Sequence, residues 1–229
     1  MSSPRTAAVL FDLDGTLIDT EPLYYEATRR VLARHGVADF GWEQHADFIG
    51  VGTRETLDVL AARFSLAPPV DALLAELNAE HLELLRSSAE VFPQMRKLVE
   101  RLRAAGVPMA VASGSSREAI GAALAHGGLA EFFPVTVSAE EVGAGKPEPD
   151  VFFEAARRLG AAPDACAVVE DSGPGVAAAH AAGMRCLAVL SVPVGPGERP
   201  GPEFRTAELV FGEGHAGFTA QAAYDWLAV

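Results

Sequence analysis

Residues 9–17 of the chain read VLFDLDGTL, and this stretch decides how the fold is interpreted. The apolar run is typical of a buried strand, and it ends in two carboxylates, Asp12 and Asp14, followed by a Gly-Thr turn. Residues i and i+2 of a strand point to the same side. Two acids held side by side repel each other unless a cation lies between them. The spacing therefore favours a metal-assisted reaction in which one carboxylate attacks and the other handles a proton.

Composition limits the size and class of the protein. The chain has 229 residues, of which 49% are hydrophobic, enough for one large domain or for a domain with an inserted subdomain. Its formal net charge of -13 argues against nucleic acid or an anionic membrane as the main partner, because both require a basic surface. An acidic protein that binds an anion needs a focal positive charge from a metal or from one well-placed Lys or Arg.

Cysteine usage and hydropathy predict a cytoplasmic protein. Cys166 and Cys186 both fall in apolar, strand-like runs, and we interpret them as reduced core thiols rather than a disulfide. No apolar segment precedes the first strand, so a signal peptide is not expected. No stretch is apolar for long enough to suggest a transmembrane span.

The segment after the first strand reads as helical for about seventy residues, with no strand candidate in it. Thr20-Glu21-Pro22 is a plausible helix start, with an acid and a proline in the first turn. Further helices are expected at 42–49, 54–64 and 70–86. We predict that residues 20–87 form an inserted helical cap, and that residues 1–19 and 88–229 form the core domain.

Helices and strands alternate from Val91 onward. Helices are expected near 95–105, 117–126, 151–159, 175–182 and at the carboxyl end, and strands at 108–113, 134–138, 165–169, 186–190 and 209–211. Alternation with nearly continuous apolar strands indicates a parallel sheet covered on both faces. The predicted fold class is α/β, a Rossmann-like three-layer α/β/α core with an all-helical cap.

Polar motifs follow the later strands, where binding crevices of such sheets lie. The second strand runs into Ser113-Gly114-Ser115-Ser116, and Ser115 with Glu118 suggests a capping box. A hydroxyl, a glycine and a helix N-terminus together make a good anion site. A plain strand-to-helix turn explains this motif equally well when it is taken alone.

Lys146 lies between Gly145 and Pro147, after the third predicted strand, 134–138. It is one of two lysines in the chain, the other being Lys97 on a predicted core helix. A compact ammonium there suits a point charge directed at a phosphate and at Asp12. A solvated turn lysine is the alternative.

The fourth strand ends in Glu170-Asp171-Ser172. Two more carboxylates would complete an oxygen-rich site suited to Mg²⁺, although the same residues could simply begin the next helix. All four motifs follow successive strands of one predicted sheet, so they must converge on one crevice. We therefore interpret them as a single site.

The order and spacing of these motifs resemble the haloacid dehalogenase-like superfamily, in particular its members with an α-helical cap, such as β-phosphoglucomutase and sugar-phosphate phosphatases. The resemblance implies that Asp12 is a nucleophile that forms an aspartyl-phosphate and that Asp14 is the general acid/base. It implies a phosphoryl group held by Ser113, Gly114 and Lys146. It also implies Mg²⁺ held by Asp12, the Asp14 backbone carbonyl, Glu170 and Asp171.

The resemblance leaves the reaction open between two enzymes. The segment 48–55 looks like the specificity loop of β-phosphoglucomutase, in which Thr53 and Arg54 would contact the substrate. Where that mutase has a histidine on its first cap helix, this chain places Tyr24, and the segment 19–22 looks more like the phosphatase branch. We expect a monomeric phosphatase of small phosphorylated metabolites, with sugar phosphates as the favoured class. A phosphosugar mutase is the alternative, and a catalytically silent sugar-phosphate-binding protein is the third hypothesis.

Other readings of the motifs are set aside. Gly173–Ala178 matches a dinucleotide-binding pattern, but the following strand ends without the acid that a ribose requires. Dehalogenation does not need Asp14, and phosphonate hydrolysis would need a cap lysine, which is missing between residues 20 and 90. Among the histidines, His45 is a weak substrate candidate, whereas surface or structural positions are expected for His81, His126 and His180. The Pro/Gly-rich stretch 193–202 is interpreted as a loop.

Overall fold

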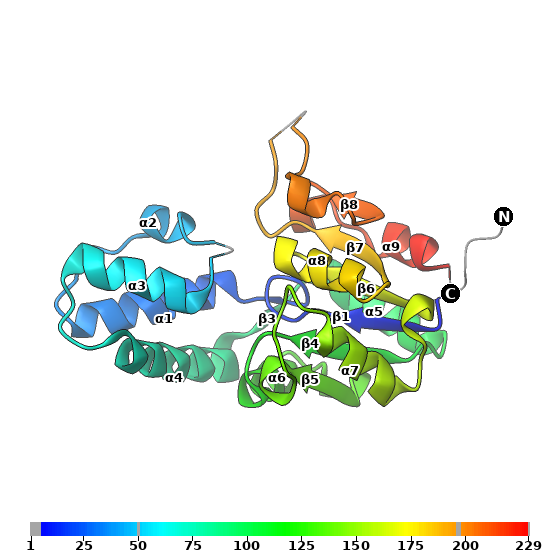
Figure 1. Cartoon of the computed structure of the whole chain (residues 1–229), viewed down its shortest axis with the longest axis horizontal. Coiled ribbons are helices and arrows are strands. Elements are labelled where there is room, and N and C mark those ends of the chain that lie inside the picture. Colours follow the sequence, from blue (N-terminus) through cyan, green and yellow to red (C-terminus); the bar gives the residue numbers. More distant parts are fainter. Residues whose placement is uncertain (1–5, 50, 196–197, 229) are drawn as a thin grey trace.

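The computed structural model describes residues 6–49, 51–195 and 198–228, which form a sheet-containing lobe and a helical lobe (Figure 1). Six parallel strands make the main sheet, in the order β5-β4-β1-β6-β7-β8. Their bounds are β1 Ala8–Phe11, β4 Met109–Ser113, β5 Val135–Ser138, β6 Cys166–Glu170, β7 Arg185–Val189 and β8 Leu209–Phe211. The predicted α/β class is confirmed.

Helices cover both faces of this sheet because its strands alternate apolar residues to each side. Val9 and Phe11 of β1 pack on one face, against α5 (Pro93–Ala104), α6 (Arg117–His126) and α9 (Ala220–Leu227). Ala8 and Leu10 pack on the other, against α7 (Asp150–Leu159) and α8 (Gly173–Ala181). The two-residue period of the strand thus fills both layers at once.

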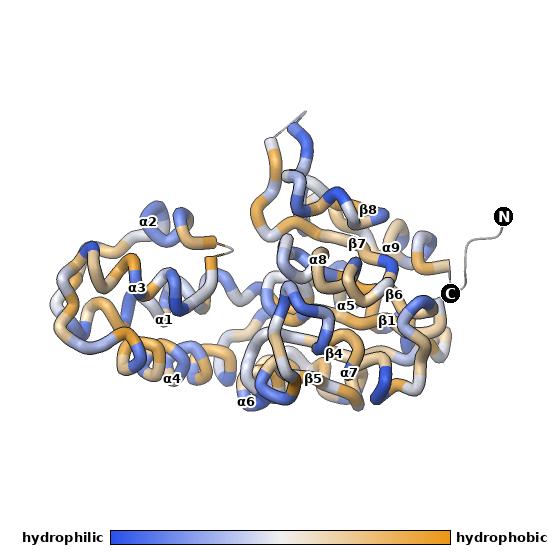
Figure 2. The backbone as a smooth tube through the Cα atoms, viewed as in Figure 1, coloured by the Kyte–Doolittle hydropathy of each residue, from blue (hydrophilic) through white to orange (hydrophobic). Residues whose placement is uncertain are grey.

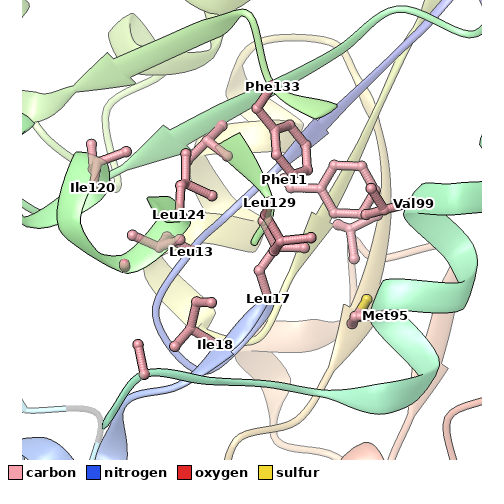
Figure 3. Packing of buried hydrophobic residues seen from close by; sticks show 14 of the residues in the cluster. Phe11, Leu13, Leu17, Ile18, Met95, Val99, Ile120, Leu124, Leu129 and Phe133 are labelled. Carbon is pink, nitrogen blue, oxygen red and sulfur yellow. The ribbon is translucent and has the colours of Figure 1, made fainter. Parts of the chain in front are cut away.

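The first of these clusters continues beyond the end of β1. Figure 3 shows Leu13 and Leu17 packed with Phe11, Met95 and Phe133. Both leucines are fully buried, and each such side chain contributes about 1.5–3 kcal/mol to folding. This packing fixes the loop that carries Asp12 and Asp14.

The helical lobe consists of α1 (Glu21–Arg34), α2 (Trp42–Ala46), α3 (Thr53–Phe64) and α4 (Val70–Ser88). Leu32, Phe40 and Leu60 form a small core of its own. Hydrophobic and hydrophilic residues alternate along α3 and α4, as expected for amphipathic helices (Figure 2). α2 ends three residues earlier than the helix predicted over 42–49, whereas most other elements lie within two residues of their expected bounds.

A two-stranded sheet connects the lobes. β2 (Ile18–Asp19) pairs antiparallel with β3 (Glu90–Val91), where the chain leaves the core and where it returns. Both strands flank the helical segment, and no strand interrupts the described residues between α1 and α4, as expected. The two strands themselves were not predicted, because two residues are too few to show alternation. The division into residues 1–19, 20–87 and 88–229 stays a prediction, and residues 1–5 lie outside the described ones.

Two sequence-based expectations concern the thiols and membrane segments. Cys166 and Cys186 are buried and free, on neighbouring strands β6 and β7, as expected. Among the helices described, none is both long and apolar enough to cross a membrane. The predicted loop 193–202 ends at a short 3₁₀ turn, Pro202–Phe204, and its residues 196–197 are outside the described ranges.

Candidate active site

A cavity of about 830 Å³ opens at the carboxyl ends of β1, β4 and β6, beneath α1, α3 and α4. Its lining includes the predicted site residues Asp12, Asp14, Thr53, Arg54, Gly114, Lys146 and Asp171. The other two, Ser113 and Glu170, lie directly behind this lining and bond to it. The sheet therefore brings together the residues predicted from four separate strand ends.

Asp12 is held at the carboxyl end of β1 by the neighbouring strand. Its backbone N–H donates to the Val169 carbonyl at 2.9 Å. Its side chain is 8% exposed, and Lys146 Nζ donates to its Oδ1 at 2.5 Å. Burial raises the pKa of Asp12 to about 8, while Lys146 acts in the opposite direction and the charges of Glu170 and Asp14 add to the rise. A carboxylate in this setting ionises more readily when a further cation is present.

The spacing of Asp12 and Asp14 predicted that they share one face of a strand. This prediction was wrong, because β1 already ends at Phe11. Asp14 lies in the following loop, where its backbone makes an isolated bridge with Ile18 and Gly15 turns the chain at a φ of 77°. Leu13, buried between them, anchors this loop in the core. Both carboxylates still line the same cavity, so the loop brings them together as the strand was expected to.

Two serines orient Asp14, Ser113 at the end of β4 and Ser115 just after it. Ser115 Oγ donates to Asp14 Oδ2 at 2.6 Å, and Ser113 Oγ donates to the same oxygen at 3.2 Å. The predicted capping role of Ser115 was wrong: Ser116 caps α6, accepting from the Ala119 N–H at 3.2 Å. Ser115 is thus a site residue that sequence reasoning missed. The predicted contact of Ser113 with a phosphoryl group stays a prediction.

Glu170 anchors Lys146. It is fully buried, and its Oε1 accepts from Lys146 Nζ at 2.6 Å. Its Oε2 accepts three more bonds, each of 2.9 Å, from the Asp171 and Ser172 N–H groups and from Ser172 Oγ. Burial alone would lower the pKa of Lys146, but Asp12 and Glu170 raise it, so the ammonium stays charged. The oxygens of Glu170 are occupied in this arrangement, and its role as a metal ligand stays a prediction.

The donor chemistry of the site fits a hard divalent cation. Four carboxylates, those of Asp12, Asp14, Glu170 and Asp171, face the single ammonium of Lys146. Burial raises the pKa of Asp171 well above its ordinary value, and Glu170 and Asp12 add to this. Among the described residues, no three His, Cys, Asp or Glu side chains are grouped closely enough to hold an ion alone. The ligand set that the family resemblance implies, namely Asp12, the Asp14 backbone carbonyl, Glu170 and Asp171, stays a prediction, and oxygens from substrate or water would complete it.

Comparison with known proteins agrees with this geometry. Residues 9–189 match the family model described as haloacid dehalogenase-like hydrolase. The chain belongs to this family. The hydrolase is 38% identical over 192 residues to a bifunctional riboflavin kinase/FMN phosphatase of Arabidopsis thaliana, an alignment that covers 82% of this chain and 49% of the relative. It is 34% identical to a fructose-1-phosphate phosphatase of Escherichia coli strain K12, over 81% of this chain and 97% of that one.

A solved structure supports the same assignment. The hydrolase matches the HAD family hydrolase from Deinococcus radiodurans R1, determined with bound phosphate and sodium, with a TM-score of 0.75 and 33% identity. The match covers 99% of this chain and 98% of that one. The chain spans about half the length of the plant relative and nearly all of this bacterial one.

Two glycines of the hydrolase make room for site carboxylates. A Cβ at Gly15 would lie 2.4 Å from Asp171 Oδ2, and one at Gly175 would lie 1.8 Å from Glu170 Oε1. Gly175 sits in the first turn of α8, whose N-cap is Ser172. Close approach of Glu170 to this turn therefore explains the glycine pattern that resembled a dinucleotide-binding motif.

We expect Gly175→Ala to lower the free energy of unfolding by about 1–3 kcal/mol, because the added methyl overpacks a buried carboxylate. The matched control is Gly121→Ala on the exposed face of α6, where no atom lies within 4 Å of the added Cβ. Helix propensity should make that variant about 0.5–1 kcal/mol more stable. Urea unfolding followed by circular dichroism measures both. Equal stability of Gly175→Ala and the parent would contradict the inferred packing.

The cap contributes an aromatic pair to the cavity. Tyr24 of α1 stacks on His81 of α4, with ring centroids 3.7 Å apart and an interplanar angle of 20°. His81 is 5% exposed, which agrees with the structural position that was one of the two expected. That it also lines the cavity was not predicted. Burial lowers the pKa of His81 and raises that of Tyr24. The spacing Leu74, Asn78, His81 places these three residues on one face of α4, but the spacing alone does not say what that face packs against.

Two of the remaining cap candidates, Arg54 and His45, have partners within the chain. Arg54 donates to Asp71 at 2.6 Å, and both side chains are exposed. His45 is buried, with Nε2 2.8 Å from Glu21 Oε1; Glu21 lines the cavity, whereas His45 is outside its lining. Thr53, at the start of α3, also lines the cavity. Gly50, in the predicted specificity loop 48–55, lies outside the described residues.

A further histidine, which sequence reasoning missed, supports the loop that carries Asp12 and Asp14. His215 Nε2 lies 2.8 Å from the carbonyl oxygen of Gly15, and its ring stacks on Phe92. Burial lowers the pKa of His215. No sequence pattern links His215 to a loop 200 residues earlier, so only the fold reveals the contact.

Proposed function

We propose that this hydrolase is a Mg²⁺-dependent phosphatase that hydrolyses small phosphorylated metabolites, sugar phosphates above all, through an aspartyl-phosphate at Asp12. The observation that carries this proposal is the pairing of Asp12 with Lys146 in a cavity that Asp14 also lines. The phosphatase relatives named above support the reaction type.

The geometry accounts for two successive displacements at phosphorus. In the first, an Asp12 oxygen forms a bond to phosphorus as the bond to the leaving oxygen breaks, and Asp14 gives that oxygen a proton. In the second, a water oxygen bonds to phosphorus while Asp14 takes its proton, and the bond to Asp12 breaks to release phosphate.

Charge neutralisation and positioning come from the surrounding residues. Lys146, held by Glu170, neutralises phosphoryl charge and keeps Asp12 in place. Ser115 orients Asp14 for both proton transfers. When bound, Mg²⁺ would neutralise the remaining negative charge of the phosphoryl group and the carboxylates. These are the main requirements of phosphoryl transfer.

The test is phosphate release by the purified protein from p-nitrophenyl phosphate and from a panel of sugar phosphates. We expect release that EDTA abolishes and added Mg²⁺ restores. With β-glucose 1-phosphate and a trace of the 1,6-bisphosphate, inorganic phosphate is the expected product. Glucose 6-phosphate as the main product would instead identify a phosphomutase. Binding of sugar phosphates without either product would identify a silent binding protein.

We also infer a cytoplasmic location and a monomeric state. The two buried, free cysteines support the first. The second comes from the family resemblance. Light scattering of the purified protein measures the molecular mass directly, and a mass of twice the chain would contradict the monomer.

A further inference from the structure

The charged residues that line the cavity are distributed unevenly. Among the described lining residues, six are acids: Asp12, Asp14, Glu21, Glu118, Glu140 and Asp171. Two are cations, and each already has a carboxylate partner, since Lys146 is bonded to Asp12 and Glu170, and Arg54 to Asp71. Glu118 is paired with Arg86, yet Glu140 has no ion pair among the described residues. Among the described lining residues, acids thus outnumber cations by six to two, so a second anionic group on the substrate would meet an excess of negative charge.

Two buried polar atoms of this cavity also lack a partner. Among the described residues, Asp14 Oδ1 and His81 Nε2 are buried without any hydrogen bond, and both residues line the cavity. The His81 ring is fixed by its stack on Tyr24. Buried polar atoms in native proteins are nearly always hydrogen-bonded, so these two indicate a group that the substrate supplies. A hydroxyl can both donate and accept, and it can therefore satisfy either atom.

We propose that the hydrolase selects phosphomonoesters whose leaving group is uncharged and carries hydroxyls, and that His81 is a specificity-determining residue that hydrogen-bonds one of them. This inference rests on the proposed phosphatase function and refines its substrate class. Asn78, one turn before His81 on α4, lines the same wall and adds an amide suited to hydroxyls. A carboxylate or second phosphate on the leaving group would meet the acidic side of the cavity without a counter-ion.

The first experiment compares two substrates with the same carbon chain, sorbitol 6-phosphate and 6-phosphogluconate. They differ at the far end, where one carries a hydroxymethyl group and the other a carboxylate. We expect kcat/KM to be at least about tenfold higher for sorbitol 6-phosphate. Equal values, or a preference for the carboxylate, would overturn the proposed selection.

A third substrate separates this inference from the function on which it rests. p-Nitrophenyl phosphate carries no hydroxyl and needs only the phosphoryl-transfer residues. If p-nitrophenyl phosphate is hydrolysed and kcat/KM is equal for sorbitol 6-phosphate and 6-phosphogluconate, the proposed selection is wrong and the proposed phosphatase function is retained. No phosphate release from any of the three substrates would overturn the proposed function itself.

The second experiment tests His81 directly with His81→Phe, which keeps an aromatic ring on Tyr24 and removes the ring nitrogens. We expect the ratio of kcat/KM for sorbitol 6-phosphate to that for p-nitrophenyl phosphate to fall at least about fivefold, mainly through KM. A merely structural role would lower both values together and leave the ratio unchanged. His126→Phe, at the exposed end of α6, is the matched control and should leave the ratio as in the parent.

A conservative variant distinguishes the hydrogen bond from packing. His81→Gln retains a donor and an acceptor, and we expect it to recover most of the ratio. If His81→Gln is as poor as His81→Phe, the effect belongs to packing and the proposed hydrogen bond is wrong. The substrate comparison uses the unaltered protein, so it tests the selection even if a variant fails to fold.

Discussion

Replacing Asp12 with asparagine is expected to lower kcat by at least about 10⁴-fold, which corresponds to about 5.5 kcal/mol of activation free energy. An amide cannot form the aspartyl-phosphate. Glu170, the other carboxylate bonded to Lys146, does not line the cavity and cannot take the place of Asp12. Steady-state release of phosphate from p-nitrophenyl phosphate and from a sugar phosphate measures the loss. Asp39→Asn, on the exposed cap surface, is the matched control and should retain full activity.

The same substitution should leave the fold intact. Burial raises the pKa of Asp12 to about 8, whereas an aspartate in the unfolded chain has a pKa of about 4. The folded state therefore binds the proton more tightly, and the contribution of Asp12 lowers the free energy of unfolding as the pH rises from about 4 to about 8. Asparagine removes this charge, and Lys146 keeps its bond to Glu170. Without added metal at pH 8, Asp12→Asn should be at least as stable as the parent in thermal unfolding. Near-parental activity in the folded variant would refute the role of Asp12.

Asp14→Asn is expected to lower turnover of sugar phosphates by about 10²–10⁴-fold, since their leaving oxygens require a proton. With p-nitrophenyl phosphate, the leaving group departs without one, so the first displacement should survive while the attack of water loses its base. Stopped-flow absorbance should then show a burst of p-nitrophenol, close to one per enzyme molecule, followed by slow turnover. Rapid steady-state turnover without a burst would contradict the assignment of Asp14.

The variant Ser115→Ala is the matched comparison for Asp14→Asn. Asp14 Oδ2 accepts from Ser115 Oγ at 2.6 Å, so Ser115→Ala removes an orienting bond and keeps the carboxylate. We expect a smaller loss than for Asp14→Asn and no burst, because both proton transfers remain possible. If Ser115→Ala loses as much activity as Asp14→Asn, Ser115 does more than orient Asp14, and the assignment of the proton transfers to Asp14 is contradicted.

The parallel sheet and the convergence of its motifs could be predicted because each rests on a strong local signal. Continuous apolar strands alternating with helices allow few topologies, and in a parallel sheet the residues after successive strands share one edge. Asp12, Lys146, Glu170 and Asp171 therefore meet as expected, although 159 positions separate the first and the last. The site could therefore be located without knowing which side chains these four residues contact.

The missed features depend on contacts that no sequence period encodes. β2 and β3 have two residues each, too few for a strand pattern. Ser115 and Ser116 are adjacent hydroxyls, and only the backbone angles after β4 decide which caps α6 and which reaches Asp14. His81 enters the site through the way the cap packs against the core, which is a tertiary effect that the pattern of α4 alone does not specify.

The central claim is that the substrate phosphorylates Asp12, and trapping that species tests it most directly. The protein is mixed with a ³²P-labelled sugar phosphate and Mg²⁺ and quenched within milliseconds. One half of the sample is counted for bound ³²P, and the other half is reduced with borohydride, which releases the phosphate, and is digested for mass spectrometry. We expect transient label on the protein and conversion of Asp12 alone to homoserine, with neither in Asp12→Asn. Phosphate release without any labelled protein, or reduction at another carboxylate, would contradict the account.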